Sequence, residues 1–517
     1  MAKLYEYQGK QILKSVKIPI PEGGVAKSVE EATNIANSIG YPVVVKIQTW
    51  STGRNAVGGV KFAENDSELK GHVERMLGMK IGNFAVELVL VEKKIAIKRE
   101  FFAGFILNDT DKCPMLLFSS RGGSGIEEIA KEYPESVATM KIDFFDGLKP
   151  FEVIALVKKT GVDSATAAGL GIVITKMYEG MKKSDARSFE VNPLVQLEDG
   201  KIMAADCHVV IDDYAVYRHP EFGIEIAREF DRPPTELERI AYMVEKNDYR
   251  GTFFFFQMNE PQDDELVVGF HGAGGGGSMM SMNAVSENGA KIANFCDTSG
   301  NPPASKVYRA AKVILSQPGI KGYFASGSGV ASQEQFHSAR GFVKAFLEEN
   351  IDIPCSIRLG GNSEEIAIEI LKEYLGDKDV QIKGFGKNDS PDKVMKHLLE
   401  GIEKNGDKGH IITPFTLPDV SKCDYSFKTM TGSIHVESAK CAECKSKACI
   451  ESCIPKILKE ENGVPKLAID EKEAKKGKCI ECLACELACM SNGNRGLKIV
   501  LPIEGLKEYR EKLMKGE

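Results

Sequence analysis

The chain has 517 residues, of which 43% are apolar and 27% are charged, as in ordinary soluble globular proteins. Its length predicts about two to four domains, and its net charge of −7 gives no basis for a nucleic-acid partner or an anionic membrane surface. No apolar run approaches the roughly 18 residues of a membrane-spanning helix, and the first residues lack the apolar core of a signal peptide. We therefore expect a cytoplasmic protein that binds neither nucleic acid nor a membrane.

The first half of the chain alternates helix and strand patterns. Helices are predicted at 27–40, ending at Gly40, and over 151–182. Strands are predicted at 41–48, 85–93 and 99–108, and segment 188–211 predicts two strands joined by a turn at Asp199-Gly200. A glycine-rich loop, 51–62, follows the first of these strands.

The second half begins with a proline-marked helical connector at 231–249 and then resumes with strands. Strands are predicted at 265–270, 322–329 and 352–359, separated by helical patterns. Strands that alternate with helices predict a parallel, doubly wound sheet, so the expected fold class is α/β. This series ends near Ile402, and a terminal helix is expected at 504–517.

Eight of the thirteen cysteines lie in two runs near the end of the chain. Two four-thiolate runs so close together indicate a pair of [4Fe–4S] clusters. In two-cluster ferredoxins the fourth cysteine of each run ligates the other cluster. We therefore assign one cluster to Cys441, Cys444, Cys449 and Cys489, and the other to Cys479, Cys482, Cys485 and Cys453. Structural zinc is the alternative, although zinc sites favour CxxC pairs at wider separations.

Two further patterns point to a nucleotide. Lys46 on a buried strand precedes a glycine-bearing loop with Arg54, and such loops let backbone N–H groups approach phosphates while the cations neutralise charge. Alone, this pattern fits an ordinary surface hairpin equally well. Asn192 and Asp206, on two neighbouring predicted strands, could converge as hard oxygen ligands for Mg²⁺.

Five segments in this order resemble the beta subunit of succinyl-CoA synthetase: LYEYQGKQIL, VVVKIQTWSTGRNAVGGVK, LVLVEK, FEVNPLV and FHGAGGGG. The resemblance covers roughly residues 2–403. It implies an ATP-grasp nucleotide-binding domain at 1–230 and a flavodoxin-like, parallel-sheet CoA-ligase domain at 231–403. We interpret 404–436 as a linker and 437–517 as a small α+β ferredoxin-like domain with two [4Fe–4S] clusters.

The resemblance also implies roles for individual residues. The nucleotide phosphates would be held by Lys46, Gly53, Arg54 and Asn55, of which Asn55 replaces a family glycine. Glu92 and Glu100 would contact adenine and ribose, Asn192 and Asp206 would bind Mg²⁺, and Glu190 would face a phosphohistidine. His208 is expected to hydrogen-bond beside the metal. The carboxylic acid would meet the loops with His271, Ser328, Gly329 and Val330.

The substrate loops depart from the family pattern. His271 stands where the family has asparagine, and Ser328 replaces the first of two paired glycines. Helix N-termini after such loops stabilise anions. We therefore expect the site to be retained with altered chemistry, which puts succinate as the acid in doubt.

The expected activity is that of the nucleotide-binding subunit of an ADP-forming acid–CoA ligase. ATP, a small carboxylic acid and CoA would give acyl-CoA, ADP and phosphate, through an acyl phosphate. A separate alpha-type subunit would carry CoA and the phosphohistidine, and the clusters would link this heteromer to a ferredoxin-linked oxidoreductase or serve as a structural module. The alternative is an electron-transfer subunit whose ATP-grasp part is a scaffold or couples ATP to reduction.

Overall fold

The computed structural model describes residues 2–50, 54, 57–81, 84–122, 126–227, 232–259 and 265–516. The chain forms two compact units, Met1–Pro234 and Thr235–Glu517, which we describe separately. Among the residues described, none of the helices combines the length and apolarity needed to cross a membrane.

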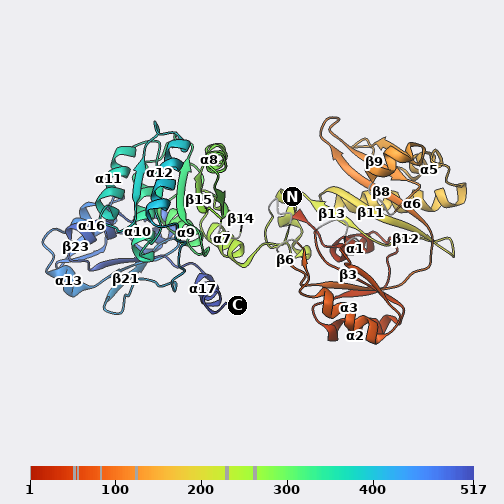
Figure 1. Ribbon diagram of the computed structural model, residues 1–517, viewed down its shortest axis with the longest axis horizontal. Helices are drawn as coiled ribbons and strands as arrows, with labels where there is room; N and C mark the ends of the chain where they lie inside the picture. The colour runs from red at the N-terminus through yellow and green to blue at the C-terminus, as the bar shows by residue number, and fades with distance from the viewer. Residues whose placement is uncertain are drawn as a thin grey trace. The chain divides into compact units, whose positions relative to one another are not determined.

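The larger sheet of the first unit is antiparallel (Figure 1). Its strand order is β1 (Ala2–Lys3), β13 (His208–Ile211), β11 (Ala186–Leu197), β8 (Ile97–Asn108), β9 (Cys113–Ser119) and β10 (Val137–Lys141), and β12 (Ile202–Ala204) pairs with β11. Three helices pack on it: α1 (Glu6–Ser15), α5 (Pro150–Lys158) and α6 (Ser164–Lys183). Their apolar faces and the sheet enclose one core, which includes Phe105, Ile174 and Phe189.

A second, four-stranded antiparallel sheet completes the first unit. Its order is β2 (Gly23–Ala26), β7 (Val89–Lys93), β3 (Val43–Ile47) and β4 (Val60–Ala63), with α2 (Val29–Ile39) and α3 (Asp66–Met76) packed against it. Ser28 caps α2, because its side chain accepts a hydrogen bond from the Glu31 N–H, and Gly40 ends it with φ 74°. The predicted helix at 27–40 and the predicted strand at 41–48 are confirmed.

The first unit also contains short elements between or after the strands of these sheets. They are β5 (Lys80–Ile81), β6 (Phe84–Ala85), α4 (Ile126–Glu132) and the 3-10 turns Pro134–Ser136, Asp213–Arg218 and Pro220–Phe222.

The predicted hairpin at 188–211 contains three strands rather than two. Its turn at Asp199-Gly200 is confirmed, because β11 pairs with β12 across it. The second strand, however, breaks at 205–207 before β13. The pairing of β11 with β8 also shifts register between Val191 and Leu194, so the ladder is interrupted on both sides of this point. Asn192 and Asp206 lie at these interruptions. Their side chains therefore need not follow the alternation between the two faces of the sheet that a regular strand imposes.

The main sheet of the second unit has seven strands. Figure 1 shows it with its surrounding helices. Its order is β14 (Phe254–Gln257), β17 (Asn294–Asp297), β15 (Val267–Ala273), β18 (Gly322–Gly327), β19 (Cys355–Arg358) and β20 (Ile382–Phe385), and β16 (Lys291–Ile292) joins β15. All pairs except β14–β17 are parallel. Counted from β15, the parallel strands follow the order 2-1-3-4-5 of the flavodoxin fold, as predicted.

Helices cover both faces of this sheet. The helices α8 (Gly275–Glu287) and α12 (Pro391–Lys404) share one core with it. On the other face lie α7 (Glu236–Asn247), α9 (Ala304–Ile314), α10 (Phe336–Glu349) and α11 (Glu364–Leu375). The doubly wound arrangement expected from the alternation of strands and helices is confirmed.

The cysteine-rich segment builds a small α+β module. It contains the antiparallel sheet β21 (Tyr425–Lys428), β22 (Ser433–Val436) and β25 (Leu497–Val500), and the hairpin β23 (Leu458–Glu461) with β24 (Val464–Leu467). Its helices are α13 (Ser438–Ala442), α14 (Ala448–Glu451), α15 (Glu471–Glu473), the π-helical turn Ala474–Lys478, α16 (Ala484–Asn492) and α17 (Leu506–Lys515). The terminal helix is confirmed.

The prediction of a linker at 404–436 is wrong for its last part. Residues 425–436 form the β21–β22 hairpin, and β22 is the central strand of the three-stranded sheet. Phe427, Ile434 and Val436 are buried in this sheet. The polar and glycine residues between them hid the strand alternation, and the partner strand β25 lies some sixty residues further along the chain.

The module and the parallel sheet share one hydrophobic core. Buried charged groups tie them together. Arg510 on α17 is fully buried and donates to the Glu349 carboxylate at 2.8 Å and to the Ser316 hydroxyl at 2.8 Å. Lys344 on α10 pairs with Glu486 on α16 at 2.7 Å. The segments predicted as separate domains, 231–403 and 437–517, therefore fold as one unit.

Candidate functional site

The first unit encloses a cavity of about 1060 Å³. One wall comes from β3, β4 and β7 of the small sheet, and the other from β8, β11 and β13 of the large sheet. Its apolar lining includes Val44, Ile95, Ile97 and Phe102, and its polar lining includes Lys46, Arg54, Glu92, Glu100, Glu190, Asn192, Asp206 and His208. An apolar wall with a few convergent polar groups is the usual form of a small-molecule site, and the volume suits a nucleotide.

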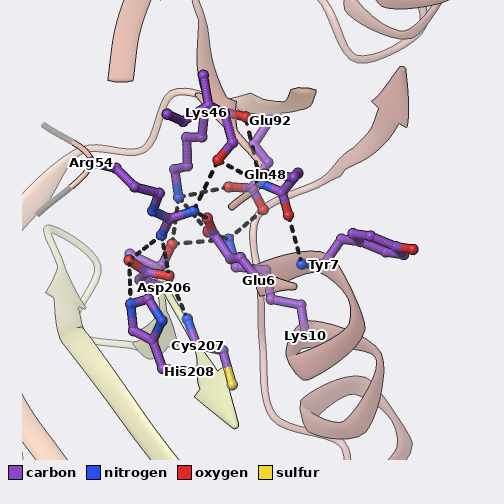
Figure 2. Close-up of polar contacts among 12 residues, drawn as sticks. Glu6, Tyr7, Lys10, Lys46, Gln48, Arg54, Glu92, Asp206, Cys207 and His208 are labelled. Atoms are coloured by element: carbon purple, nitrogen blue, oxygen red, sulfur yellow. Dashed lines mark hydrogen bonds and ion pairs between the residues drawn. The ribbon is translucent and has the colours of Figure 1, made fainter. Parts of the chain in front are cut away.

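Lys46 stands in a buried ion-pair network (Figure 2). Its Nζ lies 2.7 Å from a Glu6 carboxylate oxygen, 2.9 Å from one of Glu92, and 2.8 Å from the Ala205 carbonyl oxygen. Lys10, one turn after Glu6 on α1, contacts the same three groups. The carbonyl of Ala205 is available because the strand is interrupted there.

Arg54 joins this network to the predicted metal ligand. Its guanidinium donates to both carboxylate oxygens of Asp206, at 2.9 and 2.7 Å, and to Glu6 at 2.6 Å. Both bonds to Asp206 come from one nitrogen, Nη2. Hydrogen bonds between ionised groups are stronger than those between neutral groups. His208 lies 3.5 Å from Asp206, as expected from the sequence. Three carboxylates thus balance three cations in a largely buried network at the cavity wall.

The network shifts the ionisation of its members. Burial and the charge of Asp206 oppose the ionised form of Glu6, but Lys10, Lys46 and Arg54 outweigh them and lower its pKa to about 2. Burial likewise opposes the charged forms of Lys46 and Arg54, and the carboxylates overcome it and raise both pKa values. All of these groups are therefore charged at neutral pH.

The opposite wall offers oxygen donors. Burial raises the pKa of Glu190, while its hydrogen bond with Asn192 works against that rise. Asn192, Asp206 and Glu190 line the same wall of the cavity. A carboxylate and an amide oxygen are ligands suited to Mg²⁺. In this structure both Asp206 oxygens are taken by Arg54, so an ion would bind there in exchange for the guanidinium.

The structure brings together most of the residues predicted for the nucleotide. Lys46, Arg54, Glu92 and Glu100 all line the cavity, although Glu92 faces the two lysines. Gly53 and Asn55 lie outside the described residues. The sequence analysis missed Glu6 and Lys10. No signal in the sequence separated them from a solvated pair of charged residues four positions apart, although the structure buries both on α1.

The predicted substrate loops lie together at the carboxyl edge of the second sheet. They follow β15 and β18, the neighbouring strands at which the strand order reverses, where open α/β sheets bind ligands. A cavity of about 30 Å³, lined by residues that include His271, Ser328 and Arg358, opens there. Gly329 has φ 75°, and Val330 is exposed.

His271 is buried and fully engaged. One ring nitrogen lies 2.6 Å from the Tyr323 hydroxyl and the other 3.2 Å from the Thr298 hydroxyl. Burial lowers the pKa of His271 to about 3, so the ring is neutral. Both nitrogens already have partners, and the predicted contact with a carboxylate would require one of these bonds to break.

Arg358 is a cation in this cavity that the sequence analysis missed. Its guanidinium donates to the carbonyl oxygens of Gly327 and Asp389, each at 2.7 Å, and of Lys387 at 3.2 Å. Neutral carbonyls satisfy its hydrogen bonds but leave its charge available to an anion. Its position at the end of β19, beside the glycine loops, was the signal in the sequence.

The cysteines gather in two groups of four. Burial and the neighbouring thiols Cys489, Cys449 and Cys444 raise the pKa of Cys441 to about 12. In the second group, burial and then Cys482, Cys479 and Cys453 raise the pKa of Cys485 well above its usual range. These neighbours are the same sets that the run spacing assigns to each cluster. Seven of the eight thiols are buried, and Cys444 is half-buried.

The backbone around these thiols suits anionic sulfur. Lys447, Glu481 and Leu483 have positive φ values of 48°, 52° and 62°, and such alternation turns successive N–H groups towards one concave side, as at many iron–sulfur sites. The Leu497 N–H donates to the Cys489 sulfur at 3.4 Å. Within the described ranges, no three His, Cys, Asp or Glu side chains come close enough for a single metal ion.

Comparisons with known proteins agree with the fold. The family model of the ATP-grasp domain matches residues 3–196. The beta subunit of GDP-forming succinate–CoA ligase from Thermus thermophilus is 36% identical over 369 residues, which are 71% of this chain and 93% of that protein. The beta subunit of the ADP-forming ligase from Staphylothermus marinus is 32% identical over 403 residues, 78% of this chain and 99% of that protein.

A solved structure shares the architecture. ATP citrate lyase from Methanothrix soehngenii, in complex with citrate and coenzyme A, superposes with a TM-score of 0.63 over 77% of this chain and 100% of that chain. At 18% identity this likeness shows the fold alone.

Proposed function

Because the chain belongs to the family of succinate–CoA ligase beta subunits, we propose that it is the nucleotide-binding subunit of an ADP-forming acid–CoA ligase. The reaction is ATP, a carboxylic acid and CoA giving acyl-CoA, ADP and phosphate. The observation that carries this proposal is the cavity of the first unit, where Lys46 and Arg54 face Asn192 and Asp206.

Nucleotide binding would rearrange the ion pairs of this cavity. Lys46 and Arg54 are neutralised here by Glu6, Glu92 and Asp206. Asn192 and Asp206 would hold Mg²⁺, which neutralises phosphate charge when bound. Arg54, displaced from Asp206, would then be free to contact the phosphates, and the apolar residues of the cavity would cover the adenine.

A second subunit completes the reaction. A histidine of an alpha-type chain, which also binds CoA, takes the terminal phosphoryl group of ATP and releases ADP. The carboxylate then attacks that phosphorus and forms an acyl phosphate, and the CoA sulfur attacks the acyl carbon and expels phosphate. Glu190 lies on the cavity wall where it can hydrogen-bond the incoming histidine. The acid would bind near Ser328, Gly329 and Arg358, and the altered loops favour one other than succinate.

The cysteine module would hold two [4Fe–4S] clusters. The first is bound by Cys441, Cys444, Cys449 and Cys489, and the second by Cys479, Cys482, Cys485 and Cys453. Such clusters transfer single electrons. Since Cys444 reaches the surface, the first cluster is the natural contact for a redox partner, such as a ferredoxin-linked oxidoreductase that makes or consumes the acid.

Calorimetry with Mg-ATP on the anoxically purified full chain tests the nucleotide site. We expect binding by the wild type, a loss of at least tenfold in affinity in Lys46→Ala and Asp206→Ala, and no change in Lys201→Ala, which removes an exposed lysine of the same unit. With the alpha-type chain added, ADP release should require both CoA and acid. Ligase activity that survives in Lys46→Ala would refute the proposal.

An electron-transfer subunit is the second hypothesis, favoured by the common core of the module and the parallel sheet. It predicts that Cys482→Ala abolishes the physiological reaction even if nucleotide binding persists. Unchanged acyl-CoA formation by this variant would exclude it.

A further inference from the structure

Helix α10 presents two opposite faces to two different sites. Ser338 and Phe342, four residues apart, line the cavity at the carboxyl edge of the sheet. Arg340 and Lys344, also four residues apart, lie about 200° around the helix from them, on the face towards the cysteine module. Lys344 confirms this orientation, because it pairs with Glu486, the residue after Cys485.

The neighbouring helix α11 also contacts the module. Tyr374 on α11 donates from its hydroxyl to the Leu487 carbonyl oxygen at 3.1 Å and contacts the Ser491 hydroxyl at 2.9 Å. Both Leu487 and Ser491 lie on α16, which begins within the second cysteine run. The parallel-sheet domain therefore holds the side of the module that carries Cys482 and Cys485.

Arg340 lies in this contact without an acidic partner. Its Nη1 is buried and makes no hydrogen bond among the described residues. Its guanidinium stacks 4.7 Å from the centre of the Phe336 ring. Burial lowers the pKa of Arg340, and the charges of Cys482, Tyr374 and Cys485 oppose that shift. A buried guanidinium nitrogen with an unmade hydrogen bond is unfavourable unless an anion faces it.

We propose that Arg340 is the cationic partner of the cluster held by Cys453, Cys479, Cys482 and Cys485, and that its charge makes this cluster easier to reduce. The inference rests on the clusters of the proposed function. Four thiolates give the bound cluster a net negative charge, and one electron from a low-potential donor adds another. A fixed positive charge in a poorly solvated site stabilises the more negative state.

Two other cations near this surface are already neutralised. Lys344 is paired with Glu486 and Glu348, and Arg250 with Asp248 and Glu481. Glu481 itself accepts hydrogen bonds from Thr429 and Thr431. Arg309 donates to oxygens of Thr431 and Pro502 and has Glu481 as its charged neighbour. Arg340 instead has Cys482 and Cys485 as electrostatic neighbours, so its charge is the one that the cluster would feel.

The test is a potentiometric titration of the anoxic full chain, followed by electron paramagnetic resonance. We expect Arg340→Gln to lower the ratio of reduced to oxidised second cluster about tenfold at a fixed potential, which equals a shift of about 59 mV for a one-electron couple. The first cluster should not change. Arg340→Lys should stay near the wild type, as should Lys372→Gln, which removes an exposed charge on α11. The Cys489→Ser variant identifies which signal belongs to the second cluster.

Three outcomes decide the question. Equal potentials in Arg340→Gln and the wild type would overturn the inference, and so would an Arg340→Lys protein shifted by tenfold or more. If the Arg340→Gln protein loses its iron, the potential of the second cluster in Arg340→Lys still decides the question. Wild-type protein without acid-labile sulfide would instead refute the clusters of the proposed function.

Discussion

Glu6 offers the sharpest test of the ion-pair network, because it neutralises three cations at once. Its carboxylate contacts Lys10, Lys46 and Arg54 within 2.7 Å and is fully buried. In Glu6→Gln these cations face only Glu92 and Asp206, which leaves an excess positive charge in a largely buried network. We expect a less stable first unit that binds nucleotide phosphate relatively more favourably.

The magnitude follows from the ionisation of Glu6. Its pKa falls from 4.5 to about 2 in the folded chain, and each unit is worth about 1.36 kcal/mol, so the charged form contributes about 3 kcal/mol to stability. This agrees with the roughly 3–5 kcal/mol lost when one partner of a buried ion pair is removed. Because the folded pKa is the lower one, this contribution is present above about pH 4.5 and is lost as the pH falls towards 2.

Scanning calorimetry of the full chain measures the effect. The transition that Mg-ATP shifts belongs to the first unit, and we expect it to fall by roughly 10 °C in Glu6→Gln, since 1 kcal/mol moves a unit of this size by about 2–4 °C. Mg-ATP should recover more of the loss than it adds to the wild type. Glu74→Gln, at an exposed position of α3, is the matched control. A Glu6→Gln transition within about 2 °C of this control would refute the network as a source of stability.

Three further expectations concern other groups. Lys344→Ala leaves the buried Glu486 carboxylate without this partner and should lower the free energy of unfolding of the second unit by about 3–5 kcal/mol, measured by anoxic urea unfolding. A loss below about 1 kcal/mol would contradict a buried pair. Burial opposes the charge of His208, but Asp206 outweighs it and raises the pKa of His208, so its contribution to stability is lost as the pH rises through that value. The melting difference between wild type and His208→Gln should therefore be larger near about pH 5.5 than near about pH 8.5, and equal differences would count against this assignment. Cys489→Ser should lose half of the bound iron, whereas complete retention would contradict the grouping of the thiols.

The sequence predicted the architecture well where short-range patterns decide it. Helix α2 has its serine cap and terminal glycine in the sequence, and β3 is apolar apart from Lys46. The alternation of strands and helices after Val267 predicted the parallel sheet. The hairpin at 425–436 was missed because its stability depends on β25, a distant partner that no local pattern reveals.

The candidate site divides in the same way. Lys46, Arg54 and Asp206 could be named from loop composition and resemblance, because phosphate and metal sites need particular side-chain types. Their pairing with Glu6 could not be predicted, since a charged residue on an amphipathic helix is expected to face solvent until its neighbours are known. His271 was likewise placed near the acid by resemblance, whereas Tyr323 and Thr298 decide that its nitrogens are engaged.

The amino-acid sequence alone determined the thiol inventory, the order of the folded segments and the residue types available to a nucleotide, because these depend on spacing and periodicity along the chain. Only the tertiary structure decided which charges neutralise one another and that the cysteine module shares a core with the parallel sheet. Ion pairing and burial depend on distances of a few ångströms between segments that can be more than two hundred residues apart, as in the Arg250–Glu481 pair. Such distances exist only once the chain has packed.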